Sequence, residues 1–113
     1  MQIPCYECSR MHIEPLWQCA IIYREKGNVL LGYLLTKHAL SLPRPKEALF
    51  VERMVYDYAL LIEFANCALL LGKFQEGFDS CKELLANLNL PLEYRSQVQS
   101  NYDLAKRMLE AAQ

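Results

Sequence analysis

The apolar residues of this chain recur at helical spacing in stretches that glycine or proline separates. In the first stretch, Pro15 suits the opening turn of a helix, and the apolar pattern continues until Gly27 interrupts it. Asn28 is a good N-cap for a second helix, which Pro43 ends. The pattern therefore predicts a helical hairpin over residues 14–42.

The second half repeats this order after a connection over residues 43–53. A nearly apolar stretch, 54–71, predicts a central helix, and a further helix completes a second hairpin over 54–88. The last stretch, 91–112, predicts a helix that caps the end of the molecule. Its docking face carries residues such as Val98 and Ala105, and its solvated face carries Arg95, Gln99, Asp103 and Lys106. The sequence thus predicts an all-α fold of two antiparallel hairpins and a C-terminal capping helix.

Each predicted hairpin contains a glycine, an apolar residue two positions later and a second glycine, in segments 27–32 and 72–77. The order of large and small residues around them resembles the tetratricopeptide repeat (TPR), a pair of antiparallel helices of about 34 residues. The first copy matches well from Leu16 onward, whereas the second departs at Ala68 and Leu84. The resemblance implies a TPR-like α-α superhelix. The alternative is a generic antiparallel bundle that uses glycine at its turns.

The spacing of the two turns qualifies this resemblance. Gly27 and Gly72 lie 45 positions apart, about eleven more than one repeat of about 34 residues. The excess matches the connection over residues 43–53. We therefore expect that the two hairpins are not stacked as in a standard array.

Length and charge limit the classes of function. A chain of 113 residues predicts a single domain over 1–113, with residues 1–13 as an N-terminal segment that lacks the pattern of a signal peptide. The formal net charge of −1 favours neither nucleic acid nor an anionic membrane as a partner. The most apolar stretch contains Asp57, Glu63 and Asn66, which argues against a membrane span.

The cysteines allow one metal hypothesis. Five cysteines without a signal peptide predict reduced thiols and a cytoplasmic location. Cys5 and Cys8, with His12 nearby and Cys19 as a fourth ligand, have spacing that can bind zinc. A second ligand pair is missing from the sequence, so ordinary, partly buried thiols are the favoured interpretation and we predict no metal site.

The sequence offers no catalytic or cofactor site. His12 and His38 are the two histidines, and neither lies in a pattern that places it beside a thiol or a hydroxyl nucleophile. Both glycine pairs fall at helix–helix turns, which excludes a phosphate-binding loop. We therefore predict that the chain is not an enzyme and needs no cofactor.

Six short stretches suggest a more specific relationship: Cys5-Tyr6-Glu7, Glu14-Pro15-Leu16, Tyr23-Arg24-Glu25-Lys26-Gly27, Leu49-Phe50-Val51-Glu52, Val55-Tyr56-Asp57-Tyr58 and Asn89-Leu90-Pro91-Leu92-Glu93. In them the chain resembles the TPR-like helical region that follows the catalytic domain in certain bacterial and viral glycosyltransferase-like proteins. The resemblance implies an accessory helical domain, in cis or in trans, that supports the catalytic unit or engages its acceptor. It implies no catalysis here, because the chain lacks the Asp-x-Asp motif of such transferases.

The TPR register also predicts a binding groove. In a TPR hairpin, four positions of the first helix face the concave surface; here they are Glu14, Trp17, Ile21 and Arg24, then Ala59, Ile62, Asn66 and Leu69. The candidate contacts to a partner are Trp17, Ile21, Arg24, Ile62 and Asn66. Trp17 and Ile21 replace the lysine and asparagine of TPR clamps for a C-terminal carboxylate, which disfavours that ligand. The alternative for Trp17 is that it packs under the N-terminal segment or the last helix.

A second candidate is the motif Tyr56-Asp57-Tyr58 at the start of the third predicted helix. Its hydroxyl and carboxylate groups can bind a ligand or hold the preceding loop, and the structural role is favoured. The sequence therefore predicts a non-catalytic module that binds a protein or peptide. The alternative is an accessory domain, or a fragment, of a glycosyltransferase.

Overall fold

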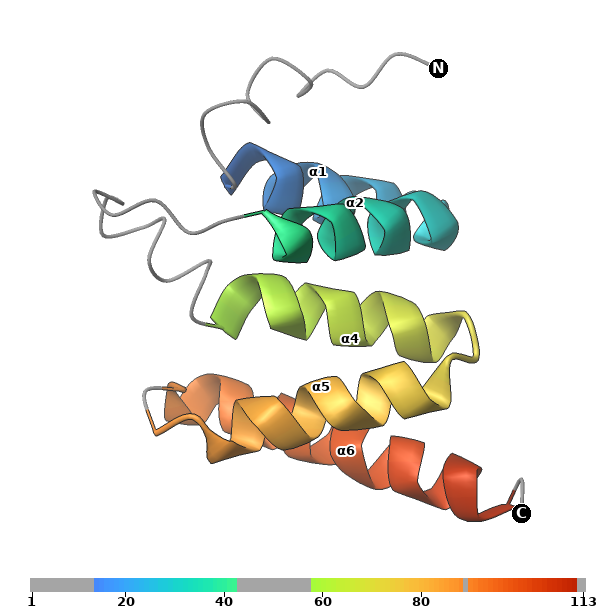
Figure 1. The fold of residues 1–113 in the computed structure, drawn as a ribbon, viewed down its shortest axis with the longest axis vertical. Coiled ribbons are helices and arrows are strands. Elements are labelled where there is room, and N and C mark those ends of the chain that lie inside the picture. Colours follow the sequence, from blue (N-terminus) through green and yellow to red (C-terminus); the bar gives the residue numbers. More distant parts are fainter. Residues whose placement is uncertain (1–13, 43–57, 89, 112–113) are drawn as a thin grey trace.

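The computed structural model describes residues 14–42, 58–88 and 90–111, and every regular element within these ranges is helical. The helices are α1 (Glu14–Glu25), α2 (Val29–Ser41), α4 (Leu60–Leu70), α5 (Phe74–Ala86) and α6 (Leu92–Ala111). Each helix packs against the next along the chain, and successive helices run in opposite directions (Figure 1). The predicted all-α class is therefore confirmed.

Where the helix bounds can be compared, they lie close to those expected from the capping, glycine and proline residues of the sequence. Ala59, directly before helix α4, already has helical backbone angles (φ −60°, ψ −42°), whereas the expected start at Met54 lies outside the described residues. The ends of α5 and α6 differ from the expected bounds by one or two residues. The connection 43–53 and the N-terminal segment 1–13 also lie outside the described residues.

The turns α1–α2 and α4–α5 share one backbone geometry. Gly27 and Gly72 have φ angles of 91° and 82°, in the left-handed region that favours glycine. In both turns the residue after the glycine donates its N–H to a carbonyl five positions earlier, at 2.8 Å, which is the Schellman ending of a helix. Asn28 is the N-cap of α2, as expected, and its side chain accepts a hydrogen bond from the Leu31 N–H at 3.3 Å. Lys73 occupies the matching place before α5 without a side-chain cap.

The second glycine of each turn segment lies where two helices approach closely. A Cβ on Gly32 would lie 3.0 Å from the Ala20 carbonyl oxygen of α1 and 3.1 Å from the Cys67 sulfur of α4. A Cβ on Gly77 would lie 2.6 Å from a methyl group of Leu69. A Cβ at position 32 would therefore press against the backbone of α1, whereas a Cβ at position 77 would require the Leu69 side chain to move.

Helix α4 is central to the core. Its Leu60 joins the cluster that α1 and α2 form, and Ile62 and Ala65 join the cluster that α5 and α6 complete. Phe64, with Cys67, Ala68 and Tyr33 of α2, forms a third cluster between these two. This explains why the stretch is apolar nearly all round.

Helix α6 closes the molecule, with one correction to its predicted faces. Val98 and Ala105 are buried, as expected. Arg95, which the sequence assigns to the solvated face, is half-buried, and its guanidinium donates to the carbonyls of Leu85 and Asn87 at 3.3 and 2.7 Å. It thereby satisfies carbonyls at the C-terminal end of α5, which a helix leaves without internal partners.

Candidate functional site

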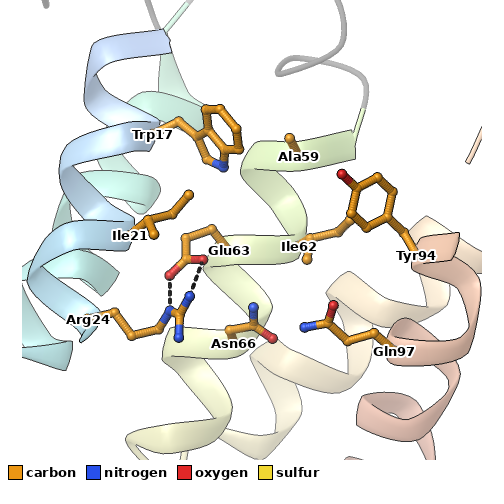
Figure 2. A pocket seen from close by; sticks show the side chains of 9 residues that line it. All are labelled: Trp17, Ile21, Arg24, Ala59, Ile62, Glu63, Asn66, Tyr94 and Gln97. Carbon is orange, nitrogen blue, oxygen red and sulfur yellow. Dashed lines mark hydrogen bonds and ion pairs between the residues drawn. The ribbon is translucent and has the colours of Figure 1, made fainter. Parts of the chain in front are cut away.

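A groove runs along α4 between α1 and α6. Its first part is a pocket of about 180 Å³, lined by Trp17, Ile21, Arg24, Ala59, Ile62, Glu63, Asn66, Tyr94 and Gln97 (Figure 2). An adjoining pocket of about 270 Å³ is lined by Arg24, Asn66, Leu69, Leu70, Gln97, Asn101 and Leu104. Because the two pockets share Arg24, Asn66 and Gln97, they form one continuous depression, which we call the α1–α4–α6 groove.

All five candidate contact residues line the first pocket. Trp17, Ile21 and Arg24 follow one another at helical spacing on α1, and Ile62 and Asn66 do the same on α4. Two faces from separate halves of the chain therefore meet at this pocket.

Trp17 contacts the core and also lines the first pocket. Its ring is half-buried and packs against the cluster of α1 and α2. Figure 2 shows Trp17 and Tyr94 on opposite sides of the pocket, one from α1 and the other from α6.

The tyrosine-rich motif contributes through one residue. Tyr56 and Asp57 lie outside the described residues. Tyr58 is half-buried, and its ring centre lies 5.7 Å from that of Tyr94. Tyr58 thus contacts Tyr94, a residue that lines the groove, whereas the loop that the motif was expected to hold lies outside the described residues.

The charged centre of the groove is an ion pair between Arg24 and Glu63. The Nε atom of Arg24 donates to Glu63 Oε2, and Nη2 donates to Oε1 at 3.1 Å. Glu63 is almost completely buried, with 4% of its side chain exposed, whereas the Arg24 side chain is 26% exposed. The hydrogen bonds that Arg24 donates to the Glu63 carboxylate raise the pKa of Arg24.

Sequence analysis did not identify Glu63 as a site residue. Its only signal is a carboxylate within an otherwise apolar stretch, and that signal argued only against a membrane span. Its partner is 39 positions away in the chain, so local patterns do not reveal the pair.

A pair of amides links α4 to α6 at the base of the groove. Asn101 Nδ2 donates to Asn66 Oδ1 at 2.9 Å. Gln97, one helical turn before Asn101, is exposed and lines both pockets. The sequence missed the α6 contribution, namely Tyr94, Gln97 and Asn101, because the TPR register assigns the concave surface to the first helix of each hairpin. The groove therefore places amide donors and acceptors between apolar side chains.

The thiols of the described core are unreactive by position. Burial, with a further contribution from the Glu63 carboxylate, raises the pKa of Cys67 to about 12, and its Sγ lies 3.5 Å from Glu63 Oε2. Burial alone raises the pKa of Cys81 to about 11. Both are free thiols that stay protonated at neutral pH, and a protonated thiol is a poor nucleophile.

Cys19 differs from these two. It is disulfide-bonded, which corrects the expectation of reduced thiols for this residue. Disulfide bonds persist mainly in oxidising compartments, so this bond gives the cytoplasmic location no support. That location stays a prediction.

The other chemical candidates can be placed only in part. His38 is exposed in the last turn of α2. Within the ranges 14–42, 58–88 and 90–111, no three side chains of the metal-binding types gather around one point. Cys5, Cys8 and His12 lie outside these ranges, so the zinc hypothesis falls outside the described residues.

Among the described helices, none has the length and apolar character needed to cross a membrane. The chain matches no protein-family model, no curated protein and no solved structure.

Proposed function

We propose that the chain is a non-catalytic interaction module of TPR type whose α1–α4–α6 groove binds a segment of a partner protein. The observation that carries the proposal is the convergence of Trp17, Ile21 and Ile62 with the polar groups of Arg24 and Asn66 on one groove. A protein segment offers both apolar side chains and main-chain hydrogen-bonding groups, so it matches both halves of this lining.

The dimensions of the groove favour a chain segment over a compact small molecule. The two parts of the groove, of about 180 and 270 Å³, follow one another along α4 instead of forming one compact cavity. The lining runs along α4 from Ala59 to Leu70. At about 1.5 Å per helical residue this is roughly 16 Å, the length of about five residues of an extended peptide.

Trp17 and Tyr94 are the aromatic residues that line the groove, and we expect them to anchor the partner segment. Tryptophan and tyrosine are enriched among the residues that dominate binding energy, especially where a pocket excludes water around them. Both rings are half-buried, so each is held by the core and still offers surface to a partner. A catalytic unit of a glycosyltransferase, in cis or in trans, is one partner that the sequence resemblance implies.

A displayed library of random 12-residue peptides tests the proposal. Trp17 is the only tryptophan, so its fluorescence reports binding at the groove directly. Gln97→Arg places a bulky charge in the groove at an exposed position, and Gln99→Arg is the matched control outside it. We expect selected peptides to change the Trp17 emission and to lose about tenfold or more in affinity, roughly 1.4 kcal/mol, for Gln97→Arg only.

Two outcomes would contradict the proposal. The library could yield no peptide that alters the emission of Trp17, or the selected peptides could bind Gln97→Arg and Gln99→Arg equally well. Circular dichroism of both variants establishes that the helical fold is intact.

A further inference from the structure

The charges of the groove are confined to one internal pair. Among the described residues that line its two pockets, only Arg24 and Glu63 are charged. The remaining lining consists of apolar, aromatic and amide side chains. A partner that enters the groove therefore meets a cation whose counter-charge is already in place.

The carboxylate of Glu63 neutralises most of the positive charge of Arg24. Its Nε and Nη2 atoms donate to the two oxygens of Glu63, which uses two of the five N–H groups of a guanidinium. Figure 2 shows the guanidinium beside Asn66, at the junction of the two pockets. Arg24 therefore has a remaining N–H donor at the groove but little uncompensated charge.

We infer that Glu63 is a specificity-determining residue, which neutralises Arg24 so that the groove prefers a partner segment uncharged at its centre. This inference rests on the proposed function. A neutral carbonyl or amide of the partner can accept a hydrogen bond from Arg24 and pair with the amides of Asn66 and Gln97. An acidic side chain would lose its hydration on entering and would meet the buried carboxylate of Glu63 as well as the guanidinium. Discrimination of this kind comes from a repulsive element as much as from an attractive one.

Removal of the Glu63 charge should shift the preference of the groove from an uncharged to an acidic partner segment. Glu63→Gln keeps the shape of the side chain but leaves the charge of Arg24 without its counter-charge. The double variant Arg24→Gln, Glu63→Gln removes both charges and restores neutrality, and it guards against the loss of stability expected when one member of a buried pair is left alone.

Matched peptides test the inference. A peptide selected by the wild type is made with glutamine or with glutamate at its central position, and its affinity is measured by Trp17 fluorescence. We expect the wild type and the double variant to prefer the glutamine form, and Glu63→Gln to shift by about tenfold towards the glutamate form. Equal preferences in the wild type and Glu63→Gln would overturn the inference while leaving the proposed function in place.

A mirror-image variant covers the case in which Glu63→Gln fails to fold. Arg24→Gln leaves the Glu63 carboxylate without its partner, at a position where the replaced side chain was partly exposed. It should shift the preference of the same peptide towards a central lysine. An unchanged preference in this variant would also overturn the inference.

Acetate provides a readout that needs no peptide. In Glu63→Gln, the guanidinium of Arg24 lacks its counter-charge, so acetate can bind it from the groove side. Acetate should then raise the melting temperature, because a ligand that binds only the folded state stabilises it. Sodium chloride at equal ionic strength is the control, and the wild type and the double variant should show no such rise. If acetate and chloride act equally on Glu63→Gln, the inference fails whether or not any peptide binds.

Discussion

The side-chain amide of Asn101 on α6 donates to the side-chain oxygen of Asn66 on α4, at 2.9 Å, and so joins the last helix to the central one at the base of the groove. These residues are 35 positions apart, and both are half-buried. The bond fixes α6, and with it Tyr94 and Gln97, as one wall of the groove.

We expect Asn101→Ala to lower the free energy of unfolding by about 1 kcal/mol, because it removes this bond and leaves the Asn66 oxygen without its partner. Urea denaturation measures the change. Ser100→Ala, at the exposed neighbouring position, is the control and should leave stability within about 0.5 kcal/mol of the wild type. Equal stability of the two variants would show that the amide pair contributes nothing.

Arg95 offers a second measurement on the same helix. Its guanidinium donates to the carbonyls of Leu85 and Asn87. Arg95→Met keeps much of the aliphatic stem but removes both bonds, so we expect a loss of about 1–2 kcal/mol in unfolding free energy. Arg107→Met, at an exposed position of α6, is the matched control and should change little. A similar effect of both substitutions would exclude a specific role of Arg95 in ending α5.

These residues also show where the sequence is informative and where it is not. Gly27 and Asn28 act within one helical turn of themselves, so the end of α1 and the start of α2 follow from local patterns. Helical spacing likewise groups Trp17, Ile21 and Arg24 on one face.

The missed features all depend on a second element. Which face of α6 is solvated depends on where α5 ends, so Arg95 was assigned wrongly. Glu63 is polar in an apolar helix because Arg24 lies across from it, and nothing near Glu63 in the chain indicates that partner. Tertiary contacts of this kind determine the chemistry of the groove, whereas local patterns determine its helices.

The turn glycines allow a test of backbone conformation alone. A Cβ at Gly27 would meet no atom within 4 Å, yet its φ angle of 91° is one that other residues rarely adopt. We therefore expect Gly27→Ala to cost about 1–2 kcal/mol in unfolding free energy and Gly27→Asn to cost less, since asparagine tolerates the left-handed region. Thermal or urea unfolding ranks the three proteins, and an alanine variant as stable as the wild type would contradict the expected strain.

The raised pKa of the Cys67 thiol predicts that the unfolding free energy falls at alkaline pH. Burial and the Glu63 charge raise its pKa from 9.0 to about 12. A raised pKa means that the folded state favours the protonated thiol, so this stabilisation is complete below about pH 9 and is lost as pH rises from 9 to 12. The loss approaches about 1.4 kcal/mol per pH unit within that window.

Unfolding free energies measured between pH 8 and 11 check this dependence. Cys67→Ala removes the titrating group, so its stability should fall less steeply above pH 9 than that of the wild type. Cys81 keeps its own contribution in both proteins, because burial raises its pKa to about 11. Identical slopes for the wild type and Cys67→Ala would show that the thiol is no more protonated in the folded state than in the unfolded chain.

The energetic link between Arg24 and Glu63 can be measured by a double-mutant cycle. Arg24→Gln leaves a buried carboxylate alone, and Glu63→Gln leaves a partly buried guanidinium alone, so each single variant should lose about 2–3 kcal/mol of unfolding free energy. The double variant removes both charges and should be clearly more stable than the sum of the single losses implies, with a coupling of about 1–3 kcal/mol. Urea unfolding at low and high salt supplies the four values, and the coupling should persist at high salt because Glu63 is shielded from solvent. A coupling near zero would mean that the two side chains do not interact energetically. Glu63 would then have no means of neutralising the charge that Arg24 presents to the groove.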